Sequence, residues 1–156
     1  MLTIRAGKQA DLPAALRLIV ELAVYEKEPD AVRTTLSTMT EDGFGKNPVF
    51  GFFVAEVDSQ IVGISLYYDR YSTWRGRMLY LEDLIVTESF RGKGVGKALL
   101  DRTIQKAKQD GYRGMMWQVL DWNEPAIEFY RRYGTNLDSQ WINCVLSHDQ
   151  LHKLAD

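Results

Sequence analysis

The chain has 156 residues and a formal net charge of −2, with 46% hydrophobic and 26% charged residues. These values are typical of a globular protein of one domain and exclude an intrinsically disordered chain. The slight negative charge argues against a protein that binds nucleic acid through a broad basic face, so no nucleic-acid partner is expected.

The composition also bears on the location of the protein. One cysteine cannot form an internal disulfide, which favours the reducing cytoplasm. The first residues, MLTIRAGKQADLP, lack a long apolar segment, and no run in the chain approaches about 18 apolar residues. We therefore expect neither a signal peptide nor a membrane span.

Hydrophobic periodicity and turn residues predict the elements before residue 90. Residues 2–6 alternate as a strand, and Asp11 is expected to cap a helix that carries Pro13 in its first turn. The apolar stripe of that helix is predicted at Leu16, Ile19, Val20 and Ala23. The next elements are a weak helix at 34–44 stopped by Gly43 and Gly45, strands at 49–57 and 60–71 joined at Asp58-Ser59, and a strand at 77–88.

Helices and strands alternate in the rest of the chain. The predicted elements are a helix at 94–109, a strand at 114–120, a helix at 123–134 with Pro125 near its start and Gly134 as its stop, a strand at 139–147 and a short helix at 148–155. Consecutive strands followed by this alternation indicate an α+β fold in a single domain, residues 1–156.

The stretch FRGKGVGKALL, residues 90–100, places three glycines at the start of a helix. A helix N-terminus presents unpaired backbone N–H groups, glycines let the backbone approach a ligand, and Arg91, Lys93 and Lys97 add positive charge. This combination is typical of a phosphate or pyrophosphate site, although it matches neither the Walker A loop nor the dinucleotide fingerprint. The alternative is an ordinary loop before an ordinary helix.

Residues 91–96, RGKGVG, resemble the R-x-x-G-x-G turn that binds the acetyl-coenzyme A pyrophosphate in the GNAT acetyltransferase superfamily. ELAVYE, EDGFGKNP, YLEDLIV and NEPAIEFYRRYG resemble its diamine acetyltransferase branch, the spermidine/spermine and thialysine acetyltransferases. Within that branch, YSTW and LDWN look more like the thialysine-type members. The resemblance implies the GNAT (acyl-CoA N-acyltransferase) fold, a central mixed, mostly antiparallel sheet flanked by helices. It also implies acetyl-CoA as co-substrate without a metal, a small-molecule amine as acceptor, and a homodimer.

The same resemblance implies roles for individual residues. Tyr130 corresponds to the general acid that protonates the leaving thiolate, and Glu82 to the group that helps deprotonate the amine through water. The positions expected to bind acetyl-CoA are Leu84, Ile85, Val86, Arg91, Gly92, Lys93, Gly94, Val95, Gly96, Lys97, Asn123 and Arg132; those expected to bind the amine are Asp83, Trp74, Tyr25 and Glu26.

Each of these roles has a plainer alternative. Tyr130 can be a packing residue, and Arg132 can belong to a solvated helix face. Glu82 and Asp83 are expected on opposite faces of their strand, where they can also be solvated or form an ion pair with Arg77 or Arg113. The N–H of Leu84 or Ile85 can donate to the developing oxyanion, or be taken up by a fully paired ladder.

Three further signals bear on the chemistry. An aromatic wall that contacts an aliphatic amine can be formed by Tyr67, Tyr68, Tyr71 and Trp74. The alternative is that these side chains pack in the core and along the strand. His148 and His152 are expected to be a surface pair rather than a metal site. Cys144, in WINCVL, is expected to be a buried structural thiol, which favours direct attack by the amine over an acetyl-enzyme. Two other functions remain open: an acetyltransferase for proteins or other amines, and a non-catalytic CoA-binding regulatory module. The presence of Glu82 and Tyr130 argues against the non-catalytic module.

Overall fold

A computed structural model describes residues 1–154 of the chain, which divides into two compact units, Met1–Gln118 and the part from Val119 onward. The first unit holds the strands β1 (Leu2–Ala6), β2 (Gly51–Val57), β3 (Gln60–Ser72), β4 (Gly76–Val86) and β5 (Met115–Met116) and the helices α1 (Leu12–Tyr25), α2 (Leu36–Phe44) and α3 (Val95–Gln109). The second unit holds α4 (Glu124–Arg131) and α5 (His148–Lys153), and short 3-10 helices cover Gln9–Asp11 and Glu88–Phe90.

The sheet of the first unit has the order β1-β2-β3-β4-β5. Neighbouring strands are antiparallel from β1 to β4, whereas β4 and β5 are parallel, which confirms the prediction of a mixed, mostly antiparallel sheet in an α+β fold. The predicted hairpin is also confirmed, because Asp58 and Ser59 join β2 to β3 with φ of +48° and +65°, the positive values that tight hairpin turns require.

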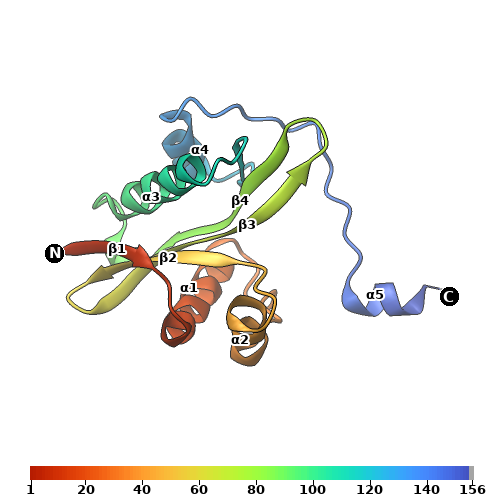
Figure 1. Ribbon diagram of the computed structural model, residues 1–156, viewed down its shortest axis with the longest axis horizontal. Helices are drawn as coiled ribbons and strands as arrows, with labels where there is room; N and C mark the ends of the chain where they lie inside the picture. The colour runs from red at the N-terminus through yellow and green to blue at the C-terminus, as the bar shows by residue number, and fades with distance from the viewer. Residues whose placement is uncertain (155–156) are drawn as a thin grey trace. The chain divides into compact units, whose positions relative to one another are not determined.

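Helices cover both faces of this sheet (Figure 1). On one face α1 and α2 pack against side chains such as Phe52, Val54 and Ile64, and on the other face α3 packs against Phe53, Ala55 and Val62. Successive residues of β2 therefore enter opposite cores, as the two-residue period of a strand requires. The two cores fix the position of β4 and of the turn that leads into α3.

The start of α1 differs from the prediction. Asp11 precedes α1 but makes no side-chain cap to it; its carboxylate accepts hydrogen bonds from the Arg5 guanidinium at 2.7 Å and 3.0 Å and from the Lys8 N–H at 2.8 Å. The hydrogen bonds from Arg5 lower the pKa of Asp11. A charged partner on β1 thus replaces the helix N–H groups, and Asp11 ties β1 to α1.

The apolar stripe of α1 is also rotated relative to the prediction. Leu12, Ala15 and Leu18 are fully buried, Leu16 and Ile19 are partly buried, and Val20 is 41% exposed. The sequence pattern was ambiguous because apolar residues occupy more than half of this helix, and contact with both α2 and the sheet selects the buried arc.

The strand predicted at 139–147 is wrong: these residues, all of them described, form no strand. Trp141, Ile142 and Val145 are 75%, 87% and 80% exposed, and Cys144, predicted to be buried, is exposed as well. Strand formation needs a partner for the backbone groups, and this segment pairs with no strand of its own chain. The predicted strand at 114–120 shrinks to the two residues of β5.

The remaining helices follow the prediction. Pro125 lies in the first turn of α4, Gly134 beyond its end has a φ of +71°, and α5 begins at His148. The last predicted residue of α5, at 155, lies outside the described residues. His148 and His152 form an exposed pair, as expected. In residues 1–154 there is no helix long and apolar enough to cross a membrane, and no group of three metal-ligating side chains.

Candidate active site

The glycine-rich turn connects the 3-10 helix Glu88–Phe90 to α3. Gly92 and Gly94 have φ of +71° and +83°, backbone conformations that other residues rarely adopt. A Cβ atom at either position would meet no atom within 4 Å. The backbone conformation therefore requires these glycines, and the space around them is open.

The N-terminus of α3 is open as well. Gly94 is its N-cap residue and supplies no side-chain hydrogen bond, so no cap side chain occupies the N–H groups of the first turn. Arg91, Lys93 and Lys97 are exposed around it; the Lys97 ammonium lies 2.5 Å from the Asp101 carboxylate, and Lys93 lies over the Phe90 ring. Backbone donors, the helix dipole and three cations fit a pyrophosphate group.

A β-bulge shapes the acidic pair of β4. Asp83 pairs with Leu66 and Leu81 pairs with the next residue, Tyr67, so Glu82 is the extra residue without a partner on β3. A bulge bends the strand and re-aims its side chains. Glu82 accepts from Tyr68 and Asp83 pairs with Leu66, two residues that share one face of β3, so the two carboxylates lie on the same face and the prediction of opposite faces is wrong. Glu82 is exposed there, whereas Asp83 is half-buried.

Glu82 is held by a tyrosine rather than by an arginine. The Tyr68 hydroxyl donates to Glu82 Oε2 at 2.8 Å, and the Tyr68 ring packs against Tyr80 at a centroid distance of 5.2 Å. Burial, and then the hydrogen bond to Glu82, raise the pKa of the Tyr68 phenol, which therefore stays a hydrogen-bond donor at neutral pH. Arg77, a candidate ion-pair partner of Glu82, lies beside Asp69 instead.

Asp83 is the most perturbed carboxyl group of this region. Burial, followed by the negative charges of Glu82 and Glu26, raises its pKa from the ordinary value of 3.8 to about 7. Burial also raises the pKa of Glu26, the residue that follows α1. A cluster of this kind lowers its own repulsion by binding a cation.

The backbone of β4 is open beyond the acidic pair. The pairing of β4 with β5 covers Leu79 and Tyr80 and then ends. In an antiparallel ladder every second residue directs its N–H and C=O away from its partner. Since β3 pairs with β4 up to Val86, residues 82–86 keep backbone groups on the other side that no described strand occupies. The ladder of β4 at Leu84, Ile85 and Val86 is therefore paired with a strand on one side only, and their contact with the donor stays a prediction.

Of the four residues of the predicted aromatic wall, Tyr68 lies beside the acidic pair, whereas the other three are placed elsewhere. Tyr67 packs against Phe53 at a centroid distance of 5.4 Å, in the core under α3. Tyr71 and Trp74 lie at the tip of the β3–β4 hairpin and are 75% and 85% exposed. The seven residues of β4 between the tip and Asp83 span roughly 20 Å, so Trp74 does not lie beside Asp83 within this chain.

Tyr25, which was expected to bind the amine, contacts the glycine turn, and its role toward the amine stays a prediction. It is the last residue of α1, and the Arg91 guanidinium lies 5.0 Å from the centre of its ring. Sequence reasoning assigned Tyr25 to the amine and did not single out Tyr68 as the partner of Glu82. The register of the hairpin contained that signal, because Tyr68 pairs with Tyr80 and so lies diagonally from Glu82.

Three predicted site residues belong to the second unit. Tyr130 is buried in α4, and its carbonyl accepts a hydrogen bond from Thr135 Oγ1 at 2.8 Å. The side chain of Asn123 caps α4, where its Oδ1 accepts from the Ala126 N–H at 3.4 Å, and Arg132 is exposed just after the helix. Their roles at the reaction centre stay predictions.

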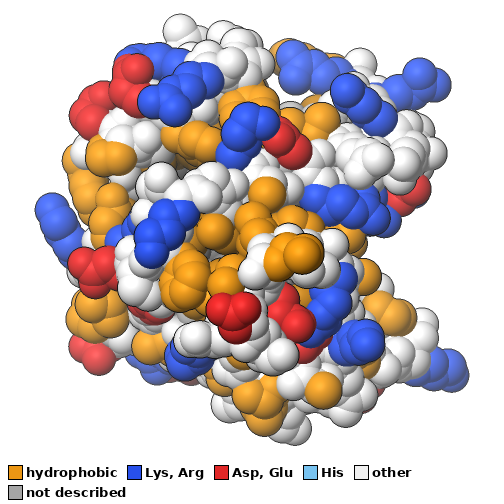
Figure 2. Space-filling model, turned by 90° about the vertical axis from the view of Figure 1, so that its left-hand side faces the viewer, with side chains coloured by type: hydrophobic (Ala, Val, Ile, Leu, Met, Phe, Trp, Pro, Cys, Tyr) orange, Lys and Arg blue, Asp and Glu red, His pale blue; other side chains and the backbone are white. Residues whose placement is uncertain are grey.

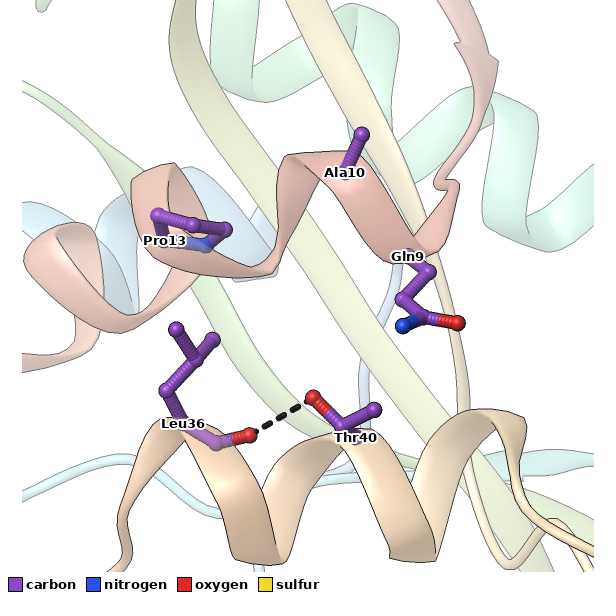
Figure 3. Close-up of a pocket in the computed structure, with 5 residues that line it drawn as sticks. All are labelled: Gln9, Ala10, Pro13, Leu36 and Thr40. Carbon is purple, nitrogen blue, oxygen red and sulfur yellow. Dashed lines mark hydrogen bonds between the residues drawn. The ribbon is translucent and has the colours of Figure 1, made fainter.

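A separate hollow lies between the start of α1 and the helix α2 (Figure 3). It is lined by Gln9, Ala10, Pro13, Leu36 and Thr40. The Thr40 hydroxyl donates a hydrogen bond to the Leu36 carbonyl at 2.8 Å. No ionisable side chain lines it, and it shares no residue with the site described above. On the face shown in Figure 2, acidic and basic side chains are interspersed, consistent with the small net charge.

The fold is shared with a solved acetyltransferase structure. The structure is similar to that of an aminoglycoside acetyltransferase from an uncultured soil metagenomic sample, with a TM-score of 0.76 at 22% identity over 94% of this chain and 95% of that one. At this identity the likeness concerns the fold.

The acetyltransferase (GNAT) family model matches residues 15–135, and the chain therefore belongs to the GNAT acetyltransferase family. This confirms the resemblance identified in RGKGVG and the segments around it. The chain is an acetyltransferase, and the family uses acetyl-CoA as its co-substrate.

Individual acetyltransferases are also similar to this chain in sequence. The chain is 40% identical over 139 residues to a thialysine N-epsilon-acetyltransferase of Sus scrofa, an alignment that covers 84% of this chain and 82% of that protein. It is 39% identical over 138 residues to the human spermidine/spermine N(1)-acetyltransferase-like protein 1, covering 84% of this chain and 20% of that longer protein.

Proposed function

We propose that this acetyltransferase transfers the acetyl group of acetyl-CoA to a primary amine of a small diamine, polyamine or lysine-like amino acid, with a thialysine-type substrate favoured. The observation that carries the proposal is the bulge that sets Glu82 and Asp83 side by side on β4, just before an open cationic turn. The names of the thialysine and spermidine/spermine relatives point to the same substrates.

The donor is proposed to bind along the end of β4 and the start of α3. The pyrophosphate fits the N–H groups at Gly94 to Lys97 and the cations at Arg91, Lys93 and Lys97. The pantetheine arm fits the side of Leu84 to Val86 that faces away from β3, where the Val86 carbonyl already accepts from Arg91 Nε. No metal is needed in this proposal, because the helix N-terminus and the cations neutralise the phosphates.

The acceptor is proposed to bind at the acidic cluster. An alkyl ammonium has a pKa of about 10.4 and must lose a proton before it can attack. Asp83 and Glu26 attract the cation, and Glu82 takes its proton through water. The neutral nitrogen then attacks the thioester carbon, the C–S bond breaks, and Tyr130 is proposed to protonate the leaving thiolate. The second proton, which the nitrogen loses as the amide forms, passes to solvent, from which the phenol regains its own. The amine is itself the nucleophile, so no acetyl-enzyme is formed.

The chain is further proposed to act as a single-domain protein, a homodimer, in the cytoplasm. The homodimer is supported by large apolar side chains that are exposed in the described part of the chain, among them Trp74, Trp141, Ile142 and Val145. Sedimentation velocity tests it: a dimer of 17.9 kDa chains is expected, and a monomer at micromolar concentration contradicts the proposal.

The substrate proposal is tested with an amine panel. Release of the CoA thiol is followed with acetyl-CoA and thialysine, lysine, ornithine, putrescine, spermidine or a peptide with a free N-terminus. The highest kcat/KM is expected with a lysine-like amino acid or a diamine. A preference for the peptide would instead assign the chain to protein acetylation.

A further inference from the structure

A carboxylate outside the predicted site contacts the segment that leads into the glycine turn. Glu21, on α1, accepts the hydroxyl proton of Thr87, whose Oγ1 lies 2.9 Å from Oε2 and 3.1 Å from Oε1, so that the two carboxylate oxygens share one donor. It also accepts from the backbone N–H of Glu88 at 2.9 Å. One of its oxygens lies 3.6 Å from Nη2 of Arg91. A single side chain thus ties residues 87–91 to α1.

The contact also covers the start of a short helix. Thr87 precedes the 3-10 helix Glu88–Phe90 and makes no side-chain cap to it; its hydroxyl donates to Glu21. Glu21 accepts the first N–H of that helix, from Glu88, which a side chain at Thr87 does not cap. Hydrogen bonds to an ionised acceptor are stronger than those between neutral groups, and a negative charge is favourable at the start of a helical turn.

Arg91 is held from three directions. Its Nε donates to the Val86 carbonyl at 2.9 Å, its Nη2 lies beside Glu21, and its guanidinium lies over the Tyr25 ring. Tyr25 follows Glu21 by four residues, so both project from the same side of α1. The position of the guanidinium is therefore specified by α1 and β4 rather than by its own flexible side chain.

We propose that Glu21 is a positioning residue for donor binding, which holds Arg91 and the glycine turn in the geometry that receives the pyrophosphate. This inference rests on the proposed binding of acetyl-CoA at that turn. Glu21 also repels an anion, but its side chain is 30% exposed and its charge is partly neutralised by Arg91, so water screens the repulsion. The ordering of a flexible arginine and of the backbone that precedes the turn outweighs it.

The test compares donor binding in three variants. In Glu21→Ala we expect the KM for acetyl-CoA and the calorimetric Kd for CoA to rise about 10-fold, with kcat at saturation within about 2-fold of the wild type. Glu21→Gln keeps one acceptor oxygen but no charge, and its Kd for CoA is expected to rise about 3-fold. The same rise is expected for Thr87→Val. Glu28→Ala removes the same charge from an exposed position just after α1 and should leave Kd unchanged.

A truncated donor separates positioning from general damage. S-acetylpantetheine lacks the pyrophosphate, so the wild type and Glu21→Ala should use it with equal kcat/KM. A defect of the same size with both donors, or CoA binding as tight as in the wild type, overturns the proposal. Glu21→Gln and Thr87→Val carry the same test if Glu21→Ala does not fold. A wild-type chain that fails to bind CoA rejects the proposed function itself, whereas tight binding by wild type and Glu21→Ala alike rejects only the positioning role.

Discussion

Replacing Asp83 by asparagine should stabilise the protein, and the gain should depend on pH. In the folded chain the pKa of Asp83 is about 7, whereas in the unfolded chain it is near the ordinary 3.8. Between these values the folded state holds a proton that the unfolded state has released. The contribution of Asp83 to the free energy of unfolding therefore falls as the pH rises from about 4 to about 7 and is level above that. Asparagine is neutral throughout and has no such dependence.

The size of the effect follows from the two pKa values. They differ by about 3, and each unit corresponds to about 1.4 kcal/mol, which gives an upper limit of about 4 kcal/mol. Asp83 is half-buried, and water near the acidic cluster screens part of the repulsion from Glu82 and Glu26. We therefore expect the advantage of Asp83→Asn over the wild type to grow as the pH rises from 5 and to reach about 2 kcal/mol at pH 7 to 8.

Urea unfolding at pH 5, 6, 7 and 8 measures this difference, with Asp30→Asn as the control because Asp30 is exposed. The stability of the control should follow the wild type at every pH. Equal pH dependence in the wild type and in Asp83→Asn would refute the reasoning, since the burial of an ionisable Asp83 would then cost nothing. The same variant should raise the KM for a diamine, because the stabilised site has lost a charge that binds the ammonium.

Three further outcomes test the proposed reaction. Gly94→Val forces a branched side chain into a φ of +83°, and Arg91→Ala removes a cation; each should raise the KM for acetyl-CoA at least about 10-fold in a folded protein, and an unchanged KM contradicts the donor site. Glu82→Gln should lower kcat/KM for the amine most at neutral pH, since more amine is already neutral at high pH; a defect of constant size indicates a structural role. Tyr130→Phe should lower kcat by about 10²–10⁴-fold while the calorimetric Kd for CoA stays nearly unchanged, and a near-wild-type rate would make the phenol a packing residue.

Much of the first unit could be predicted because its signals are local. Gly92 and Gly94 carry the positive φ values of the turn, and Asp58-Ser59 forms the turn of the hairpin. Short-range patterns of this kind depend on the backbone preferences of a few residues. The two adjacent acids Glu82 and Asp83, which interrupt an otherwise apolar strand, are also a local signal that can be read from the sequence.

The failures concern features that depend on distant partners. Asp11 was expected to cap α1 but pairs with Arg5. The bulge at Glu82 follows from the register with β3, which no pattern within β4 reveals. Residues 139–147 have the composition of a strand, yet strand formation needs a second strand beside it, and none of the described strands pairs with them.

The last turn of α1 links the two halves of the proposed reaction. Glu21 and Tyr25 contact Arg91 at the donor turn, while Glu26, one residue after the helix, adds to the negative field at Asp83. Acetyl transfer requires the thioester carbon and the amine nitrogen to approach in a fixed geometry, and errors of about 1 Å are costly. A rigid helix that contacts both the donor turn and the acidic cluster sets the distance between them. This arrangement explains why ELAVYE belongs with the functional segments of the sequence although it contains none of the proposed acid–base groups.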